Sequence, residues 1–410
     1  MASLPTLGSP GKRVEHALYR PRHIVLVADP AMAKAGLLAR NLAGGGFRGR
    51  LSVVGMTAQG LEEVAGIAAL AQPVDLAVLA LAADRAEGVL RELALIGCRA
   101  VVVPGAVPDL GAIAARTGVD VLGEGSFGVC VPGIGLNASL THLPPRPGRL
   151  ALVSQSSAIA RAVIDWAEAE AVGFSHVIGI GGNAGLGFAH ALDWLSRDPG
   201  TGAILLDIRR IRNRRMFVSA ARAAARSRPV VAIRAGARVG DPSGVAEAVM
   251  DAALRRAGVL PVSGLEDLLS AAETLARVRL FARGGPGDRI AVVANATGLA
   301  GLAADAIVAG GARLAEGNPV VLGPDAGAAL GETAARLTTT REVDAVVAVH
   351  APVAGEGPEQ VSAALAAAAR ARGAAPLLVG WAGQATAGAQ RAALARAGVA
   401  VFPTPEAAVR

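Results

Sequence analysis

The sequence has few cysteines and few aromatic residues. Cys98 and Cys130 are its two cysteines, and aromatic residues make up 3% of its 410 residues. A single cysteine pair builds neither a disulfide framework nor a metal cluster, so we expect both thiols to be small buried apolar groups and no metal to be bound. Because rings are scarce, Ala, Val, Leu and Gly must fill the core, which favours helices packed on a sheet over an aromatic-rich sandwich.

Lysine is almost absent from the sequence. Lys12 and Lys34 are the only two, so the other 38 of the 40 basic residues are arginines, and the formal net charge is +7. The basic residues are scattered, and few aromatic residues lie near them to stack against bases. We therefore interpret the positive charge as a compositional bias and expect no nucleic-acid partner.

Long apolar runs are also missing. None approaches the roughly 18 residues that a membrane-spanning helix needs. The N-terminal stretch, "MASLPTLGSPGKRVEHALYR", lacks the apolar core of a signal peptide. These two absences predict a reduced, cytoplasmic protein without a membrane segment.

Short apolar runs alternate with helical-period segments along the chain. Most runs are continuously apolar, which is typical of parallel strands buried on both faces. The predicted strands are 23–29, 50–56, 76–82, 100–106, 119–122, 149–155, 175–180, 202–208, 229–235, 289–296, 344–350, 376–382 and 399–403. The alternation predicts an α/β protein with doubly wound parallel sheets.

Two breaks divide this pattern. "THLPPRPGR" at 141–149 carries three prolines, and "ARGGPGDR" at 282–289 is rich in Gly and polar residues. We therefore expect domains at 1–142, 148–282 and 288–410. The last two each open with a strand that ends in small residues, "VSQSSA" and "ANATGLA", which indicates a duplicated flavodoxin-like unit.

The strand ends are the places to search for a ligand site, because open parallel sheets bind ligands beyond the carboxyl ends of their strands. Small residues at these ends let a phosphate or thioester reach backbone N–H groups. The first domain lacks the G-x-G-x-x-G fingerprint, and no P-loop occurs anywhere. A NAD dehydrogenase and a P-loop NTPase therefore have no support.

The serine run at 154–157 allows two interpretations. It stands where an apolar strand ends and a helical pattern begins. A serine in this position is a favoured helix N-cap. The unpaired N–H groups and partial positive charge of the same helix end also suit a bound anion.

Several motifs together resemble the NDP-forming acyl-CoA synthetases, relatives of the succinyl-CoA synthetase alpha chain. "SQSSA" is similar to that family's Ser-Gln-Ser-Gly-Ala, and the stretch 164–206 is similar over its whole length. Further similar pieces are "NLAGGGFRGRL", "VDLAVLAL", "LNAS", "ANATGLAG", "GNP" and "PEAAVR". The finest likeness, in "DWAEAEAVGFSHV" and 217–236, is to the synthetase-like region of bacterial protein lysine acetyltransferases.

The resemblance implies a CoA-binding Rossmann-like domain followed by two flavodoxin-like, succinyl-CoA-synthetase-like domains. It also implies CoA or acyl-CoA as the cofactor. The residues that it places at the cofactor site are Ala28, Asp29, Lys34, Gly36, Val54, Ala80, Pro104, Gly105, Ser126, Ser154, Gln155, Ser156 and Asn295.

Within this set, Lys34 favours a bound phosphate and Asp29 disfavours it. Lys34 falls on the family's Pro-x-Lys-x-Gly pattern, and a compact ammonium suits a phosphate. Asp29 beside a CoA pyrophosphate would repel it.

The resemblance also exposes departures from the family. Active members carry a phosphorylated histidine in a Ser-His-Thr-Gly loop, whereas the corresponding stretch here, 234–254, contains no histidine. Arg209 stands where the family shows a glutamate that orients the phosphohistidine. No other side chain in the stretch can carry a phosphoryl group in the same way. We therefore assign no catalytic residue.

Three functions follow from these observations. The first is a CoA- or acyl-CoA-binding module that regulates, or is a degenerate part of, an acetyltransferase or acyl-CoA synthetase system. The second is the alpha-type chain of an NDP-forming acetate or acyl-CoA ligase that works with a separate ATP-grasp subunit. The third is a structural interaction module that self-associates, and the sequence does not specify the acyl group or the oligomer.

Overall fold

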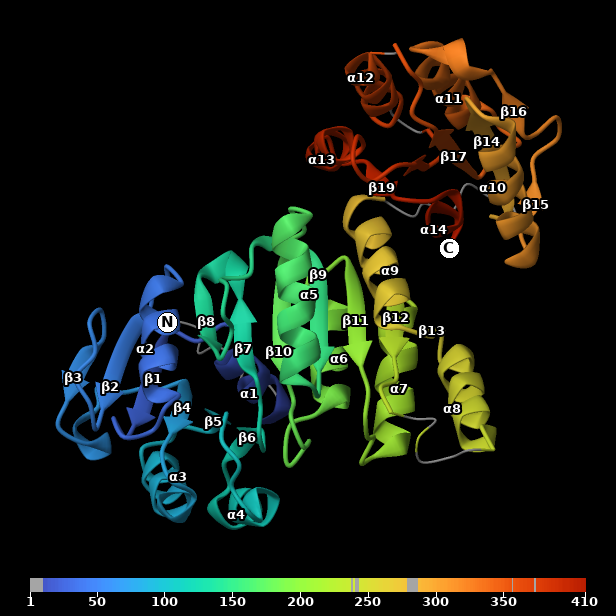
Figure 1. Cartoon of the computed structure of the whole chain (residues 1–410). Coiled ribbons are helices and arrows are strands. Elements are labelled where there is room, and N and C mark those ends of the chain that lie inside the picture. Colours follow the sequence, from blue (N-terminus) through green and yellow to red (C-terminus); the bar gives the residue numbers. More distant parts are fainter. Residues whose placement is uncertain (1–9, 237–238, 240–242, 279–286, 356, 372–373) are drawn as a thin grey trace, which may run out of the picture. The chain divides into compact units, whose positions relative to one another are not determined.

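The chain forms two compact units that together hold three β-sheets (Figure 1). The computed structural model describes residues 10–236, 239, 243–278, 287–355, 357–371 and 374–410. The first unit is Met1–Gly264 and contains two sheets, and the second is Leu265–Arg410 and contains one. The expected mixture of helices and parallel sheets is confirmed. The domain limits near 142 and 282 stay a prediction.

The first sheet has the strand order of a Rossmann fold. Its six parallel strands run β3-β2-β1-β4-β5-β6, the order of dinucleotide-binding sheets. The strands are β1 (His23–Ala28), β2 (Arg50–Val54), β3 (Glu62–Val64), β4 (Leu76–Ala80), β5 (Ala100–Val102) and β6 (Asp120–Leu122). The helices are α1 (Pro10–Tyr19), α2 (Ala35–Gly44), α3 (Ala86–Leu95) and α4 (Leu110–Thr117), with short 3-10 turns at Ile67–Ala69 and Ala83–Arg85.

Both faces of this sheet are buried, which explains its continuously apolar strands. Successive side chains of a strand point to opposite faces. Ile24 and Leu26 therefore pack with α1 and α2, whereas Val25 and Val27 pack with α3 and α4. Cys98 is buried in the second of these layers. Burial raises the pKa of its thiol to about 12, so it remains a protonated core residue at neutral pH.

The second sheet combines five parallel strands with an antiparallel hairpin. Its order is β13-β12-β11-β9-β10-β7-β8. The strands are β7 (Gly128–Val131), β8 (Leu136–Ser139), β9 (Pro147–Ser154), β10 (Phe174–Gly179), β11 (Ala203–Asp207), β12 (Val230–Ile233) and β13 (Val259–Val262). The helices are α5 (Ser157–Ala169), α6 (Phe188–Arg197), α7 (Arg214–Ala225) and α8 (Val245–Arg256), with a 3-10 turn at Pro132–Ile134. The five parallel strands follow the flavodoxin order.

The hairpin of β7 and β8 adds two antiparallel strands, which the sequence did not predict, to the expected parallel sheet. It pairs antiparallel with β10. The sequence 128–139 contains glycines and polar residues, so it did not read as a buried strand. β8 is the edge strand, whereas β7 has a neighbour on each side, and every residue of both strands is buried. The segment at 141–149, expected to be a linker, ends inside β9.

The sheet of the second unit also follows the flavodoxin order. Its path is β15-β14-β17-β18-β19, and β16 pairs with β14 off this path. The strands are β14 (Arg289–Ala294), β15 (Arg313–Leu314), β16 (Val320–Val321), β17 (Ala345–His350), β18 (Leu377–Trp381) and β19 (Ala400–Phe402). The helices are α9 (Leu265–Arg277), α10 (Thr297–Ala309), α11 (Ala329–Thr339), α12 (Pro358–Ala368), α13 (Gly388–Arg396) and α14 (Pro405–Val409), with a 3-10 turn at Pro324–Ala326.

The shared order of the second and third sheets agrees with the expected duplication of a flavodoxin-like unit. The predicted break at 282–289 begins in residues that lie outside the described ones. Among the described residues, every helix is too short or too polar to cross a lipid bilayer.

Candidate functional site

Each sheet has one place where the strand order reverses, and the sequence candidates gather at these places. The reversals lie between β1 and β4, between β9 and β11, and between β14 and β17. Beyond the carboxyl ends of such a strand pair, the connections leave in opposite directions and open a crevice for ligands.

The first reversal brings Ala28, Val54 and Ala80 to one edge. Ala28 lies opposite Ala80, and Val54 pairs with the residue before Ala28. Gly55 follows Val54 with a φ of +91°, and a Cβ on it would lie 2.3 Å from the carbonyl oxygen of Ala28. This edge therefore requires glycine at position 55, and Ala28 and Ala80 themselves are buried.

Asp29 has two partners within the chain. Its Oδ1 accepts a hydrogen bond from the backbone N–H of Ala31 at 2.9 Å, and its Oδ2 lies 3.6 Å from Nη1 of Arg85. The repulsion expected between Asp29 and a pyrophosphate is reduced by this guanidinium. Arg85 precedes α3, far from Asp29 in the sequence, so no local pattern pointed to it.

Lys34 lies at the same edge and is exposed. Its Nζ donates to the carbonyl oxygen of Pro104 at 3.0 Å. Lys34 is also the N-cap residue of α2, whose first turn contains no acidic residue, and Gly36 lies within that turn. A cation and the partial positive charge of a helix end therefore occur together at this edge, which is what an anionic ligand requires.

A series of hydrogen bonds links this edge to the second sheet. The N–H of Gly125 donates to the carbonyl of Gly105 at 2.8 Å, and the N–H of Gly182 donates to Glu124 at 2.7 Å. Gln155 continues the series through its Nε2, which donates to the carbonyl of Gly181 at 3.3 Å. The candidates of the first sheet and those of the serine run are thus joined through the loop 123–126.

Ser126 in this loop has a structural role. It is buried, its hydroxyl donates to the carbonyl of Gly179, and the N–H of Gly128 donates to the same hydroxyl at 2.9 Å. These bonds connect the start of β7 to the end of β10. The hydroxyl predicted to contact a cofactor therefore faces the protein interior.

The serine run caps α5 and also donates hydrogen bonds to the buried carboxylate of Asp207. The hydroxyl of Ser156 accepts from the N–H of Ile159 at 3.3 Å, so Ser156 caps α5 as one interpretation predicted. Asp207 ends the adjacent strand β11 and is fully buried. Its Oδ2 accepts from the hydroxyl of Ser154 at 2.7 Å and from the N–H of Ser156 at 3.0 Å.

Asp207 therefore occupies the place that the anion hypothesis reserved for a ligand. Burial raises the pKa of this carboxyl, and the hydrogen bonds from Ser154 and Ser156 oppose that rise. Sequence reasoning missed Asp207, although a carboxylate at the end of the apolar run "GAILLDI" was a usable signal. An internal anion at a helix N-terminus excludes an external one from the same donors.

Gln155 connects the serine run to the arginines that follow Asp207. Its Oε1 accepts from the N–H groups of Arg209 and Arg210, both at 2.8 Å. With its Nε2 bonded to Gly181, the amide holds three loops together. Its predicted role as a ligand contact is therefore combined with a structural one.

Asn295 directly follows β14, at the strand-order reversal of the third sheet. It is buried, its Nδ2 donates to the carbonyl of Ala351 at 2.8 Å, and its Oδ1 accepts from the N–H of Ala351 at 2.7 Å. One side-chain amide thus pairs with both backbone groups of a single residue beyond β17. Beside it, the buried ring of His350 stacks on Trp381 with centroids 4.1 Å apart.

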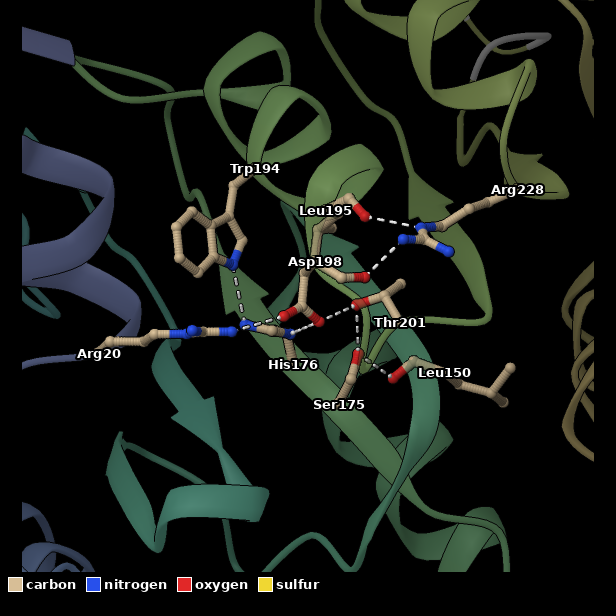
Figure 2. A network of polar contacts seen from close by, with 9 residues as sticks. All are labelled: Arg20, Leu150, Ser175, His176, Trp194, Leu195, Asp198, Thr201 and Arg228. Atoms are coloured by element: carbon tan, nitrogen blue, oxygen red, sulfur yellow. Dashed lines mark hydrogen bonds and ion pairs between the residues drawn. The ribbon is translucent and has the colours of Figure 1, made fainter. Parts of the chain in front are cut away.

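A polar network lies at the opposite, amino edge of the second sheet (Figure 2). Nε1 of Trp194 donates to Nε2 of the buried His176 at 3.1 Å. Asp198 Oδ2 accepts from the hydroxyl of Thr201 at 2.9 Å and lies 4.0 Å from Nδ1 of His176. Because Nε2 is an acceptor, His176 is neutral, and burial lowers its pKa to about 4.

The network in Figure 2 does not form a nucleophilic triad. The hydroxyl of Ser175 donates to the carbonyl of Leu150 at 3.2 Å and shares a 2.9 Å hydrogen bond with Thr201. Nε2 of His176 is bonded to Trp194, so it faces a donor and not a hydroxyl that it could deprotonate. The network instead connects Arg20, which follows α1, to the second sheet. Nη2 of Arg20 donates a hydrogen bond to Oδ1 of Asp198 at 3.1 Å.

Comparison with known proteins finds similarity to CoA ligases over part of their length. Residues 147–275 match the family model of the succinyl-CoA ligase like flavodoxin domain. The chain is 32% identical over 220 residues to acetate–CoA ligase (ADP-forming) I of Archaeoglobus fulgidus, a match that covers 51% of this chain and 31% of that enzyme. It is 26% identical over 324 residues to the alpha subunit of acetate–CoA ligase (ADP-forming) I of Pyrococcus furiosus, covering 71% and 68% respectively.

A solved structure has the same fold. It is the apo form of the dinucleotide-forming acetyl-coenzyme A synthetase 1 of Candidatus Korarchaeum cryptofilum, with a TM-score of 0.89 and 24% identity over 96% of this chain and 95% of that one. The finer likeness to acetyltransferase-associated regions stays a prediction. Residues 147–275 form a succinyl-CoA ligase like flavodoxin domain, and the chain is a relative of the NDP-forming acyl-CoA synthetases, as its motifs indicated.

Proposed function

We propose that this chain is a CoA- or acyl-CoA-binding module of the synthetase type that does not carry a phosphoryl group. It serves as a regulatory or degenerate part of an acyl-CoA synthetase or acetyltransferase system. The names of its relatives, which are acetate–CoA ligases, support CoA as the ligand.

One observation carries the proposal: Asp207 occupies the donors of Ser154 and Ser156 at the N-terminus of α5. The resemblance implies that the serine loop of active relatives receives the phosphohistidine. A phosphoryl group brought to the same donors would meet a buried carboxylate, and like charges at such short range repel strongly. The absence of histidine from 234–254 agrees with this arrangement.

The first sheet supports CoA binding. Bound CoA would supply a thiol that carries an acyl group as a thioester. Lys34, held by the carbonyl of Pro104, would hold the phosphates together with the N-terminus of α2. Arg85 offsets the charge of Asp29, and the small residues Ala28 and Ala80 allow a ligand to approach the strand ends.

A binding experiment with a matched pair of variants tests this proposal. CoA and acetyl-CoA are titrated into the protein and followed by calorimetry and by thermal unfolding. A true ligand raises the stability by mass action, by about 2.7 kcal/mol at one hundred times its Kd. We expect Lys34→Glu to weaken binding by about tenfold or more, because it replaces a phosphate-binding cation with an anion.

Arg99→Glu is the matched control, since Arg99 is exposed, precedes the amino end of β5 and undergoes a comparable change from a cation to an anion. Its effect on CoA affinity should be small. Failure of CoA and acetyl-CoA to bind at millimolar concentration would overturn the proposal.

A second candidate function is that of a ligase alpha chain working with a separate ATP-grasp subunit. It is favoured by the match that covers 68% of an alpha subunit. Incubation of the chain with such a subunit and labelled ATP would distinguish the two functions. Acid-labile phosphate on this chain would establish the second candidate, and unlabelled protein in the presence of bound CoA would support the first.

A further inference from the structure

The exposed face of α7 carries a row of arginines, which we call the arginine stripe: Arg214, Arg215, Arg222 and Arg226. The stretch 208–236 around it contains nine arginines and no acidic residue, so this surface is strongly positive. The residues that line the surface depression over the helix are Arg214, Arg215, Val218, Ser219, Arg222, Ala223 and Arg226, all of them exposed except the half-buried Val218.

Arginines on two other helices are paired with a carboxylate one turn away. Arg91 donates to Glu87 on α3 at 2.6 Å, and Arg197 donates to Asp193 on α6 at 2.8 Å. Among the described residues, no carboxylate forms such an ion pair with the arginine stripe. Its positive charge is therefore left for a group outside the chain.

The arginine stripe opposes the stability of α7 in two ways. Arg222 and Arg226 are four residues apart, and like charges at this spacing on a helix repel. Arg214 and Arg215 lie in the first turn, which contains no acidic residue, and cations there oppose the partial positive charge of the helix end. Local rules are broken most often at functional sites. An anionic partner would remove both repulsions.

The composition of this surface indicates what kind of anion it fits. Phe217 is the only aromatic residue of 208–236 and is 3% exposed, so the surface offers no ring on which a nucleic-acid base could stack. A second copy of the chain has the same net charge of +7, which disfavours self-association here. Carboxylates remain, and they pair with guanidinium groups in a bidentate arrangement. Arg215 and Arg226 lie about 16 Å apart along the helix axis, about three helical turns.

We propose that the arginine stripe binds an acidic helical segment of a partner protein. Carboxylates repeated along one face of that segment pair with Arg215, Arg222 and Arg226. The small side chains of Ser219 and Ala223 between them allow the two helices to approach closely. The inference goes beyond the proposed function, since it concerns a protein-binding surface on the second sheet and not the CoA site of the first.

Two synthetic helical peptides of identical composition test the assignment against the full chain. The matched peptide carries glutamates spaced three or four residues apart, on one face of its helix, whereas the control peptide distributes the same glutamates around the helix. We expect the matched peptide to bind at least about tenfold more tightly in fluorescence anisotropy, because several charge-assisted pairs form together. Its affinity should fall as salt screens the charges.

Variants of the chain locate the binding surface. Arg222→Gln/Arg226→Gln should weaken the matched peptide by about tenfold or more. Arg255→Gln/Arg256→Gln is the matched control, because it removes two exposed arginines from α8, and it should bind like the unmodified chain. Arg215→Glu protects the test against misfolding, since an anion in the first turn favours the helix while it repels the peptide. It should unfold at no lower temperature than the unmodified chain.

Three results would overturn the assignment. They are equal or absent binding of the two peptides, unchanged affinity in Arg222→Gln/Arg226→Gln, and tighter binding of a short DNA duplex than of the matched peptide. CoA titrated in parallel reports on the first-sheet site, so a failure of the proposed function is recognised separately.

Discussion

The strand-order reversals of the first and second sheets are built alike but are used differently. At the first, small residues end the strands, and an exposed lysine lies beside the N-terminus of α2. At the second, the N-terminus of α5 is already supplied with a carboxylate, since Asp207 accepts from Ser154 and Ser156. The same backbone geometry therefore leaves one helix end available to an external anion, whereas an internal carboxylate occupies two of the donors at the other.

This difference shows that a helix N-terminus next to a strand end does not by itself make an anion-binding site. Its donors bind whichever acceptor lies closest, and a residue of the neighbouring strand has the advantage of being held in place. The reversal of the third sheet makes the same point. There the acceptor and donor are the backbone of Ala351, and they use the whole amide of Asn295.

The largest expected effect is that of Gly55→Ala, which disturbs the carboxyl ends of the strands in the first sheet. The added Cβ would collide with the carbonyl of Ala28, and a φ of +91° is strained for any residue with a side chain. We expect a loss of more than about 2 kcal/mol of stability and of CoA binding. Urea unfolding measures the first and calorimetry the second.

Gly36→Ala is the matched control on the same edge, because its nearest neighbour would be 3.9 Å away and its backbone is helical. It should fold at least as well as the unmodified chain. If Gly55→Ala proved equally stable, the required close approach of β1 and β2 would be refuted.

The next effect sharpens the comparison at the third sheet. Asn295→Ala leaves the N–H and carbonyl of Ala351 without their partner, which should cost about 1–3 kcal/mol. Unfolding of the variant measures this cost. CoA affinity should not change if the amide is purely structural, and a parallel loss of affinity with intact stability would show that it contacts the ligand.

Asp207→Asn tests the buried carboxylate of the second sheet through the pH dependence of the free energy of unfolding. Burial raises the pKa of Asp207 above its unfolded value, so the folded chain holds this proton more tightly. Its contribution to stability therefore falls as pH rises from about 4 towards neutrality. The variant should lose that decline when unfolding free energies are compared across this range, whereas Asp84→Asn, at an exposed position, should keep it. Parallel curves for Asp207→Asn and the unmodified chain would contradict the assignment.

The smallest effect is expected at the amino edge, where the sign is reversed. Burial lowers the pKa of His176 from 6.5 to about 4, so the unfolded chain binds the proton more tightly. Stability from this group is complete above pH 6.5 and falls as the pH is lowered towards 4. His176→Gln should flatten this part of the profile. Titration of the imidazole by NMR at its ordinary pKa in the folded protein would argue against the buried, neutral ring.

Much of the architecture could be predicted from local pattern. Runs such as 23–29 and 202–208 are continuously apolar because both faces of their strands are covered, and the structure places β1 and β11 there. The hairpin of β7 and β8 escaped prediction because glycine, proline and polar residues interrupt its apolar pattern, although both strands are buried. The cap at Ser156 was predictable, since capping depends on residues within one turn.

The candidate site was predictable only in part. Ala28, Ala80 and Lys34 were placed at one edge by the rule that parallel strands share a carboxyl end. The partners that decide their chemistry come from elsewhere in the chain: Arg85 for Asp29 and Asp207 for Ser154. No spacing along the sequence encodes those contacts.

The sequence by itself determined the class of fold, the helix that begins after the serine run, and the lack of a histidine in residues 234–254. The tertiary structure alone decided which helix end holds an internal carboxylate and that Nη1 of the half-buried Arg234 has no hydrogen-bond partner among the described residues. The physical reason is the separation along the chain over which each interaction acts. Hydrophobic period and capping act over a few residues, whereas charge compensation and desolvation depend on which strands the fold brings together.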